Sequence, residues 1–280
     1  MINCIHSVSV FAKLLLPVFA GLYELAIFAG MSMDKNFPLV LFWPGYFMYA
    51  GRGADTKVHA HHAIQIAIAL ESPIDVVYKS GQGSYQAVII NSDVAHECRT
   101  HGSSFVLINI DPETDIGAAL KKEYLGKSGI AALASVDEYL SQLKSLLAGH
   151  NPTDEIYQLT NHFLHSIAHK HTPEPLDERI GQVLELLRQP ELEVVSVKDL
   201  AGAVHLSPGR LIHLFTQQVG IPVRKYILWS KLMASLKRLD RHANFTHVAL
   251  GGGFADAPHF NRTFKRMFGL SPTALLKSGR

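Results

Sequence analysis

The sequence has few of the residues that stabilise small secreted proteins. Its 280 residues include only two cysteines, Cys4 and Cys98, and neither lies in a C-x-x-C pair or another metal-ligand spacing. Two cysteines are too few for a disulfide framework, so the fold must depend on an apolar core. A hydrophobic content of 48% can supply that core. This cysteine usage fits a reducing cytoplasm, which is the location we expect.

Charged residues are also scarce, at 18% of the chain, and they are unevenly distributed. Residues 179–280 carry 15 Lys and Arg against 6 Asp and Glu, a net charge of +9. Residues 1–178 carry 11 Lys and Arg against 18 Asp and Glu, a net charge of −7. A basic end on an acidic body predicts that one end of the chain binds a polyanion such as nucleic acid. The alternative is that the uneven distribution of charge arises by chance.

The sequence contains one long apolar run near its start. Residues 8–33 are about as long as a membrane span, but Lys13, Pro17 and Glu24 interrupt them and no cleavage site frames them. This run has three possible interpretations: a membrane anchor, a helix packed on the body, or an extension that precedes an ordinary domain start at Met31 or Met33. We favour the extension, residues 1–32, and expect no membrane partner.

The pattern of apolar residues changes twice along the rest of the chain. In residues 33–112, short runs rich in Val, Ile and aromatic residues predict the strands of an antiparallel barrel or sandwich: LVLFW, AIQIAIAL, IDVVY, YQAVII and FVLINI. Residues 113–172 show helical periodicity instead, and we expect a helical region that links or dimerises the chain. The segment 171–177, with two prolines, is the predicted linker to a C-terminal domain at 176–280.

The C-terminal domain is predicted to contain seven helices and a pattern that recurs after 49 positions. Each copy has a helix-capping residue, an apolar pair four residues apart and a terminal glycine: Ser207, Leu211, Phe215 and Gly220 in the first, and Asp256, Phe260, Phe264 and Gly269 in the second. A short helix, a tight turn and a capped second helix form a helix-turn-helix unit. Two such units can place two helices in successive major grooves of DNA.

The residues off the apolar faces are the predicted DNA contacts. We assign them as Arg210, His213 and Gln217 in the first copy, and His259, Asn261, Arg262 and Lys265 in the second. Arginine reads guanine and asparagine reads adenine with paired hydrogen bonds, whereas lysine binds phosphate. The first copy has Gly209 and Ile212 on this face, so the second copy is expected to be the stronger base reader.

The strings SVKDLAGAVHLSPGRLIHLFTQQVGIPVRKYILWSKL and GFADAPHFNRTFKRMFGLSP resemble the AraC family of bacterial transcription regulators. The resemblance covers residues 176–280 and implies two helix-turn-helix subdomains joined by a long helix at 223–239, with recognition helices at 208–218 and 257–267. The chain departs from the family at Gly251 and Gly252, where helix-forming residues are usual. The resemblance also implies an N-terminal cupin-like domain that binds a small effector or dimerises.

Four polar residues of the predicted barrel form a candidate sensor site: His59, His61, Gln65 and His96. Their order resembles the metal set of cupin barrels, and three imidazoles can bind a divalent metal. Gln65, however, stands where the cupin set has glutamate. We therefore predict no metal and no other cofactor, and expect histidines that are structural or face an effector; a metal site is the alternative. Phe42, Trp43 and Tyr46 are candidates for the lining of a pocket, although aromatic residues of this kind more often belong to the ordinary core.

The sequence thus predicts an α+β protein, with an N-terminal cupin-like β-barrel and helical layer followed by an all-α tandem helix-turn-helix domain. We expect a cytoplasmic, sequence-specific transcription regulator and not an enzyme. Its expected partners are double-stranded promoter DNA, a small-molecule effector, a second copy in a homodimer, and RNA polymerase. The alternative function is a metal-dependent cupin-type oxygenase or isomerase with a merely helical tail.

Overall fold

The computed structural model describes residues 38–53, 55–126, 129–134, 136–149, 153–168, 175–189, 196–239 and 244–277. The predicted extension 1–32, the apolar run 8–33 and most of the linker 171–177 lie outside these ranges. Among the helices that the structure describes, none is both long enough and apolar enough to cross a membrane.

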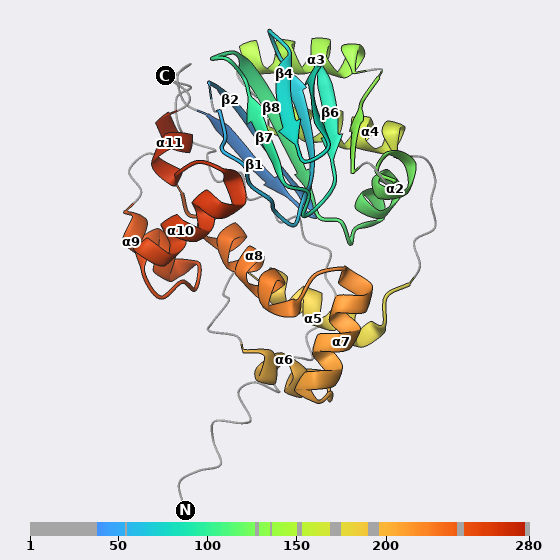
Figure 1. Cartoon of the computed structure of the whole chain (residues 1–280), viewed down its shortest axis with the longest axis vertical. Helices are drawn as coiled ribbons and strands as arrows, with labels where there is room; N and C mark the ends of the chain where they lie inside the picture. Colours follow the sequence, from blue (N-terminus) through green and yellow to red (C-terminus); the bar gives the residue numbers. More distant parts are fainter. Residues whose placement is uncertain are drawn as a thin grey trace, which may run out of the picture.

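Nine strands in the described residues form two antiparallel sheets (Figure 1). The larger sheet has the order β1-β2-β8-β3-β6-β9 and the smaller has the order β5-β4-β7. The strand bounds are Leu39–Trp43 (β1), Tyr46–Arg52 (β2), Ile64–Ala69 (β3), Ile74–Tyr78 (β4), Gly81–Tyr85 (β5), Ala87–Ile90 (β6), His96–Arg99 (β7), Ser104–Ile110 (β8) and Ile130–Ala132 (β9).

Strand β3 shows how the sequence gives the two faces of the larger sheet different roles. Its three isoleucines, at positions 64, 66 and 68, pack into the core beneath the helical layer. The alternate positions, Gln65 and Ala67, line a cavity between the sheets. Side chains alternate between faces along a strand, so the small side chain of Ala67 leaves space on the inner face. This alternation creates the cavity that becomes part of the candidate site.

Three helices cover the outer face of the larger sheet: α2 (Asp115–Tyr124), α3 (Asp137–Ala148) and α4 (Thr153–Ile167). Helix α2 begins at Thr114, whose side chain accepts a hydrogen bond from the backbone N–H of Gly117. Tyr139 of α3 stacks on Phe163 of α4 with ring centroids 4.2 Å apart, which joins these two helices over the sheet.

Seven helices follow in the described C-terminal part: α5 (Glu178–Arg188), α6 (Val197–Ala203), α7 (Pro208–Val219), α8 (Val223–Leu236), α9 (Phe245–Gly251), α10 (Ala257–Phe268) and α11 (Pro272–Lys277). They form two apolar cores that α8 connects. The core around α5, α6 and α7 contains residues of the helical domain alone, whereas the core around α9 and α10 also includes Phe42, Phe47 and Ala63 from the barrel. Accordingly, α9, α10 and α11 lie beside the sheet, and α6 and α7 lie away from it (Figure 1).

The predicted α+β class is confirmed, and so is the run of seven helices after the linker. The sequence reading missed β2, β5, β7 and β9. Strand β9 returns to the edge of the larger sheet, beside β6, within a segment that the sequence pattern predicts to be helical.

Candidate nucleic-acid interface and sensor site

The 49-residue repeat corresponds to two helices of 12 residues each, α7 and α10, with the same end structures. Ser207 and Asp256 cap the two N-termini by accepting a backbone N–H three residues later. Gly220 and Gly269 end the helices in the left-handed conformation, at φ 86° and 71°. The repeat in sequence is therefore a repeat of local structure, with α6–α7 as the first unit and α9–α10 as the second.

The structure exposes most of the side chains that the sequence assigns to DNA contact. They are Arg210, His213 and Gln217 on α7, and Asn261, Arg262 and Lys265 on α10. His259 is half-buried, and its ring packs edge-on against Phe254 at 5.1 Å. Within the described residues, none of Arg210, Arg262 and Lys265 has an ion-pair partner, so these cations are available to a polyanion.

The two unusual glycines before the second unit have a steric explanation. A Cβ atom on Gly252 would lie 1.8 Å from the Oγ and 2.8 Å from the backbone nitrogen of Ser235 on α8. A Cβ atom on Gly251 would lie 2.8 Å from the side chain of Arg238. These glycines therefore allow α9 to pack closely on the end of α8. The gain in packing offsets the cost of glycine in a helix, about 1 kcal/mol relative to alanine.

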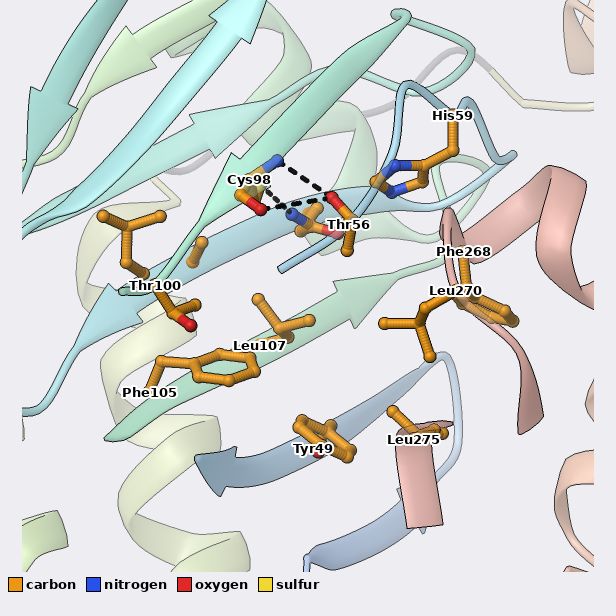
Figure 2. A pocket seen from close by; sticks show the side chains of 13 residues that line it. Tyr49, Thr56, His59, Cys98, Thr100, Phe105, Leu107, Phe268, Leu270 and Leu275 are labelled. Atoms are coloured by element: carbon orange, nitrogen blue, oxygen red, sulfur yellow. Dashed lines mark hydrogen bonds between the residues drawn. The ribbon is translucent and has the colours of Figure 1, made fainter. Parts of the chain in front are cut away.

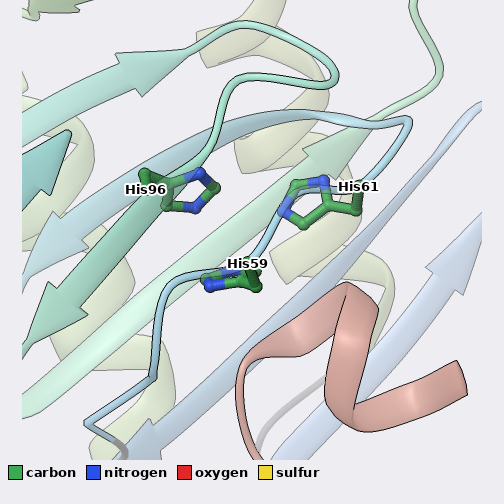
Figure 3. Close-up of side chains that lie close together, drawn as sticks. All are labelled: His59, His61 and His96. Atoms are coloured by element: carbon green, nitrogen blue, oxygen red, sulfur yellow. The ribbon is translucent and has the colours of Figure 1, made fainter. Parts of the chain in front are cut away.

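The structure brings together the four polar residues of the predicted sensor site. His59, His61, Gln65 and His96 are all buried, at 5%, 3%, 3% and 1% exposure. One ring nitrogen from each of the three histidines lies within 4.8 Å of the others (Figure 3). The backbones of His59 and His96 also form a β-bridge, with two hydrogen bonds of 2.9 Å.

Burial keeps these histidines neutral. It lowers the pKa of His61 to about 3, and it lowers the pKa of His59 and His96 as well. Burial also raises the pKa of the Cys98 thiol to about 12, so Cys98 is uncharged beside them. At neutral pH the cluster therefore presents unprotonated imidazole rings.

A small cavity, with about 40 Å³ of space for the centres of water-sized spheres, lies between the sheets next to His59 (Figure 2). Most of its lining is apolar, with Tyr49, Phe105 and Leu107 from the barrel. Its remaining wall comes from the C-terminal helical part, in a set of residues at and after the end of α10: Phe268, Leu270 and Leu275. A molecule in this cavity would contact both parts of the chain.

A buried polar network forms a second connection between the two parts. The Glu113 carboxylate, 3% exposed, accepts hydrogen bonds from His62 Nε2 at 3.0 Å, from Arg188 at 3.3 Å and from the Tyr226 hydroxyl. Burial raises the pKa of Glu113, but the bonds from His62, Tyr226 and Arg188 outweigh it and lower the pKa overall. A buried carboxylate with several donors is stable as an ion, so the network ties the barrel to α5 and α8.

A family model described as a helix-turn-helix domain matches residues 200–278. RhaS of Escherichia fergusonii, an HTH-type transcriptional activator, is 32% identical over 109 residues, which cover 38% of this chain and 38% of RhaS. LumQ of Photobacterium leiognathi, a probable transcriptional regulator, is 26% identical over 194 residues, which cover 66% of this chain and 76% of LumQ. Residues 200–278 are therefore similar to the helix-turn-helix domains of bacterial transcription regulators.

The fold extends the likeness beyond the matched domain. ToxT of Vibrio cholerae superimposes with a TM-score of 0.54 over 84% of this chain and 98% of ToxT, at 14% sequence identity. The barrel and the helical part of this chain therefore both have counterparts in one solved fold.

The structure places the three aromatic candidates for a pocket in packed cores. Phe42 stacks on Phe47, at 5.4 Å, in the core shared with the second unit. Trp43 and Tyr46 pack on Tyr157 of the helical layer, at 5.6 and 6.4 Å. All three lie outside the lining of the cavity. Phe42 and Trp43 belong to the edge strand β1 and Tyr46 begins β2, and the pairing of these strands could not be read from the local sequence.

Proposed function

We propose that the chain is an AraC-type transcription regulator that reads promoter DNA through α7 and α10, and that α10 contributes more of the sequence preference. The observation that carries the proposal is the matched pair of capped helices with exposed polar faces. Helix α10 offers Asn261 and Arg262, which suit adenine and guanine, together with Lys265 for phosphate. Helix α7 offers Arg210 and His213 beside the apolar Ile212, which is 39% exposed.

Selection from random DNA with the full chain tests this assignment. We expect Arg262→Ala to weaken binding to the selected site by about 1–3 kcal/mol and to relax the preference at one base position. Lys265→Ala is the matched control, because loss of a phosphate contact weakens binding to all sequences and lowers the salt dependence. If Arg262→Ala retains the preferred sequence of the parent, α10 does not read bases through Arg262.

We further propose that an apolar effector in the barrel cavity controls this DNA binding. The support is the shared wall, since Phe268 and Leu270 follow directly from the helix that carries Arg262. ToxT, which shares the fold, has been solved with a bound unsaturated fatty acid. A long-chain fatty acid is therefore the first class of effector to test.

The remaining partners follow from this role. A regulator of this kind acts in the cytoplasm, where its promoter lies, and contact with RNA polymerase is part of the proposal. The helices α3 and α4 are the proposed dimer contact. The proposal assigns no reaction to the barrel, since Gln65 stands where a cupin-type enzyme carries a carboxylate.

A further inference from the structure

We propose that His59, His61 and His96 bind one divalent transition-metal ion, with Zn²⁺ as the best fit, and that this ion braces the loop on which the second helix-turn-helix unit docks. The inference goes beyond the proposed function, because it adds a ligand of another class and does not depend on how DNA is read.

The first argument comes from the tautomers of the three rings. Each histidine has its Nδ1 within hydrogen-bond distance of a backbone carbonyl: Lys57 at 2.9 Å for His59, Ala63 at 3.0 Å for His61, and Val94 at 2.8 Å for His96. A carbonyl oxygen only accepts, so the proton of each neutral ring lies on Nδ1. The lone pair of each ring then lies on Nε2. Metal-binding histidines are held in the same way, with the other ring nitrogen donating to a carbonyl or carboxylate.

The second argument is that the free nitrogen of His96 lacks a donor. His96 Nε2 is buried and has no hydrogen-bond partner among the described residues. The neighbouring rings cannot supply one, because each has already donated its only N–H to a carbonyl. The rings of His59 and His96 nevertheless lie 4.2 Å apart by their centroids. Buried acceptors that converge without a donor are costly, and a cation removes that cost.

Gln65 adds a third observation. Its amide nitrogen points to the sulfur of Cys98, at 3.7 Å, so its Oε1 lies 3.1 Å from His61 Nε2. An oxygen acceptor facing a nitrogen acceptor requires either a cation between them or an amide turned by 180°. With a cation, Gln65 Oε1 is available as a further oxygen ligand, at the position where the cupin metal set has glutamate.

The ligand chemistry and spacing select the metal. Three neutral imidazoles suit Zn²⁺ and other late divalent ions, whereas Ca²⁺ and Mg²⁺ require oxygen ligands. Zinc binds nitrogen at about 2.0–2.1 Å in a tetrahedron, which places the nitrogens roughly 3.4 Å apart. The three ring nitrogens lie within 4.8 Å of one another, so small rotations of the side chains bring them to this distance.

The site lies directly against the second unit. The ring of His61 packs on Trp229 of α8 at 6.1 Å and on Phe268 of α10 at 6.0 Å. The backbone N–H of Lys57, two residues before His59, donates to the carbonyl of Gly269 at 3.0 Å. A metal ion that fixes His59 therefore also fixes the loop that holds the end of α10.

Zinc titration of the full-length chain, without an affinity tag and after treatment with a chelator, tests the proposal. We expect one equivalent of Zn²⁺ per chain in competition with a chromogenic chelator. His96→Asn should lower the affinity by about 100-fold, the loss expected for one of the few ligands of a zinc site. His101→Asn is the matched control, because His101 lies on the same barrel but is exposed and pairs with Asp75. Equal zinc affinity of His96→Asn and the parent protein would overturn the site.

Two further measurements keep the proposal testable should His96→Asn not fold. Cobalt(II) added to the parent chain should give the visible absorption bands of a tetrahedral site at one equivalent, and their absence would count against the site. Zinc should also slow hydrogen exchange at the amide of Lys57. An unchanged exchange rate in the zinc-loaded chain would show that the ion does not brace the docking loop.

Discussion

At the scale of single residues, the buried carboxylates Asp111 and Glu113 have opposite environments. Glu113 accepts three hydrogen bonds and stays ionised. Burial, with the neighbouring charge of Glu113, raises the pKa of Asp111 to about 6; Arg188, His62 and Lys237 only partly offset this. Two adjacent carboxylates rarely ionise with equal ease. Glu113, which accepts more hydrogen bonds, is therefore ionised, whereas ionisation of Asp111 is disfavoured.

This difference predicts a pH dependence of stability. The pKa of Asp111 is raised in the folded protein, so its contribution is fully present below the unfolded value and is lost as the pH rises through about 6. Asp111→Asn should therefore flatten the decrease in unfolding free energy between pH 4.5 and 7, measured by urea denaturation. Glu185→Gln, on the exposed face of α5, is the control and should leave the slope unchanged. An Asp111→Asn slope equal to that of the parent would contradict the raised pKa.

The exposed residues of α10 could be predicted from the sequence, whereas the buried network around Glu113 could not. Asn261 and Arg262 were predictable, because a capped amphipathic helix fixes which side chains point outward within a few residues. Glu113 was not, since its three partners are 51, 75 and 113 positions away along the chain. Interactions at such separations depend on how the barrel and α8 pack, which no local pattern encodes.

At the scale of elements, the glycines that end α7 and α10 look equivalent in sequence but have different surroundings. A Cβ atom on Gly220 would meet nothing within 4 Å. A Cβ atom on Gly269 would lie 2.3 Å from the carbonyl oxygen of Lys57 and 2.8 Å from His59 Nδ1. The first glycine serves only the turn, whereas the second also allows the helix end to approach the barrel.

Alanine substitution separates these two roles. Gly220→Ala should cost about 1–2 kcal/mol, the strain of a left-handed residue that carries a Cβ atom. Gly269→Ala carries the same strain and also forces the end of α10 away from Lys57, so its loss of unfolding free energy should be larger. It should also expose the segment after α10 to a protease, which Gly220→Ala should not. Equal losses for the two variants would mean that the contact with the barrel does not hold the second unit.

The strands were predicted unevenly, for physical reasons. Buried strands such as β3 and β6 are continuous apolar runs and are visible in the sequence. Strand β5, with the sequence GQGSY, is largely exposed, and β9 has only three residues. Both form because a neighbouring strand offers unpaired backbone groups, so their existence depends on the assembled sheet and not on their own side chains.

At the scale of the whole molecule, the two helix-turn-helix units differ in their packing against the barrel as well as in the polar residues that they expose. The second unit shares an apolar core with the barrel and closes its cavity, whereas the first unit has a core of its own (Figures 1 and 2). The sequence repeat predicted two similar readers but could not show that one of them is docked. Under the proposed function, an effector that alters the cavity acts first on the second unit, which carries Asn261 and Arg262.

Occupation of the cavity can be tested with oleate, used below its micelle concentration. A ligand at ten times its dissociation constant stabilises the folded chain by about 1.4 kcal/mol. For a chain of this size, that corresponds to a rise of roughly 3–6 °C in the midpoint of thermal unfolding. The affinity for the selected DNA should change in the same titration, because the effector contacts the wall formed by Phe268 and Leu270.

A variant that fills the cavity distinguishes this site from surface binding of a fatty acid. Leu107→Trp places a larger ring in the cavity, so the stabilisation by oleate should fall to a small fraction of that of the parent. Leu39→Trp makes the same change on the edge strand β1, outside the cavity lining, and should keep the full response. The same response to oleate in both variants would place the fatty acid elsewhere, and the barrel would then act on α10 without this ligand.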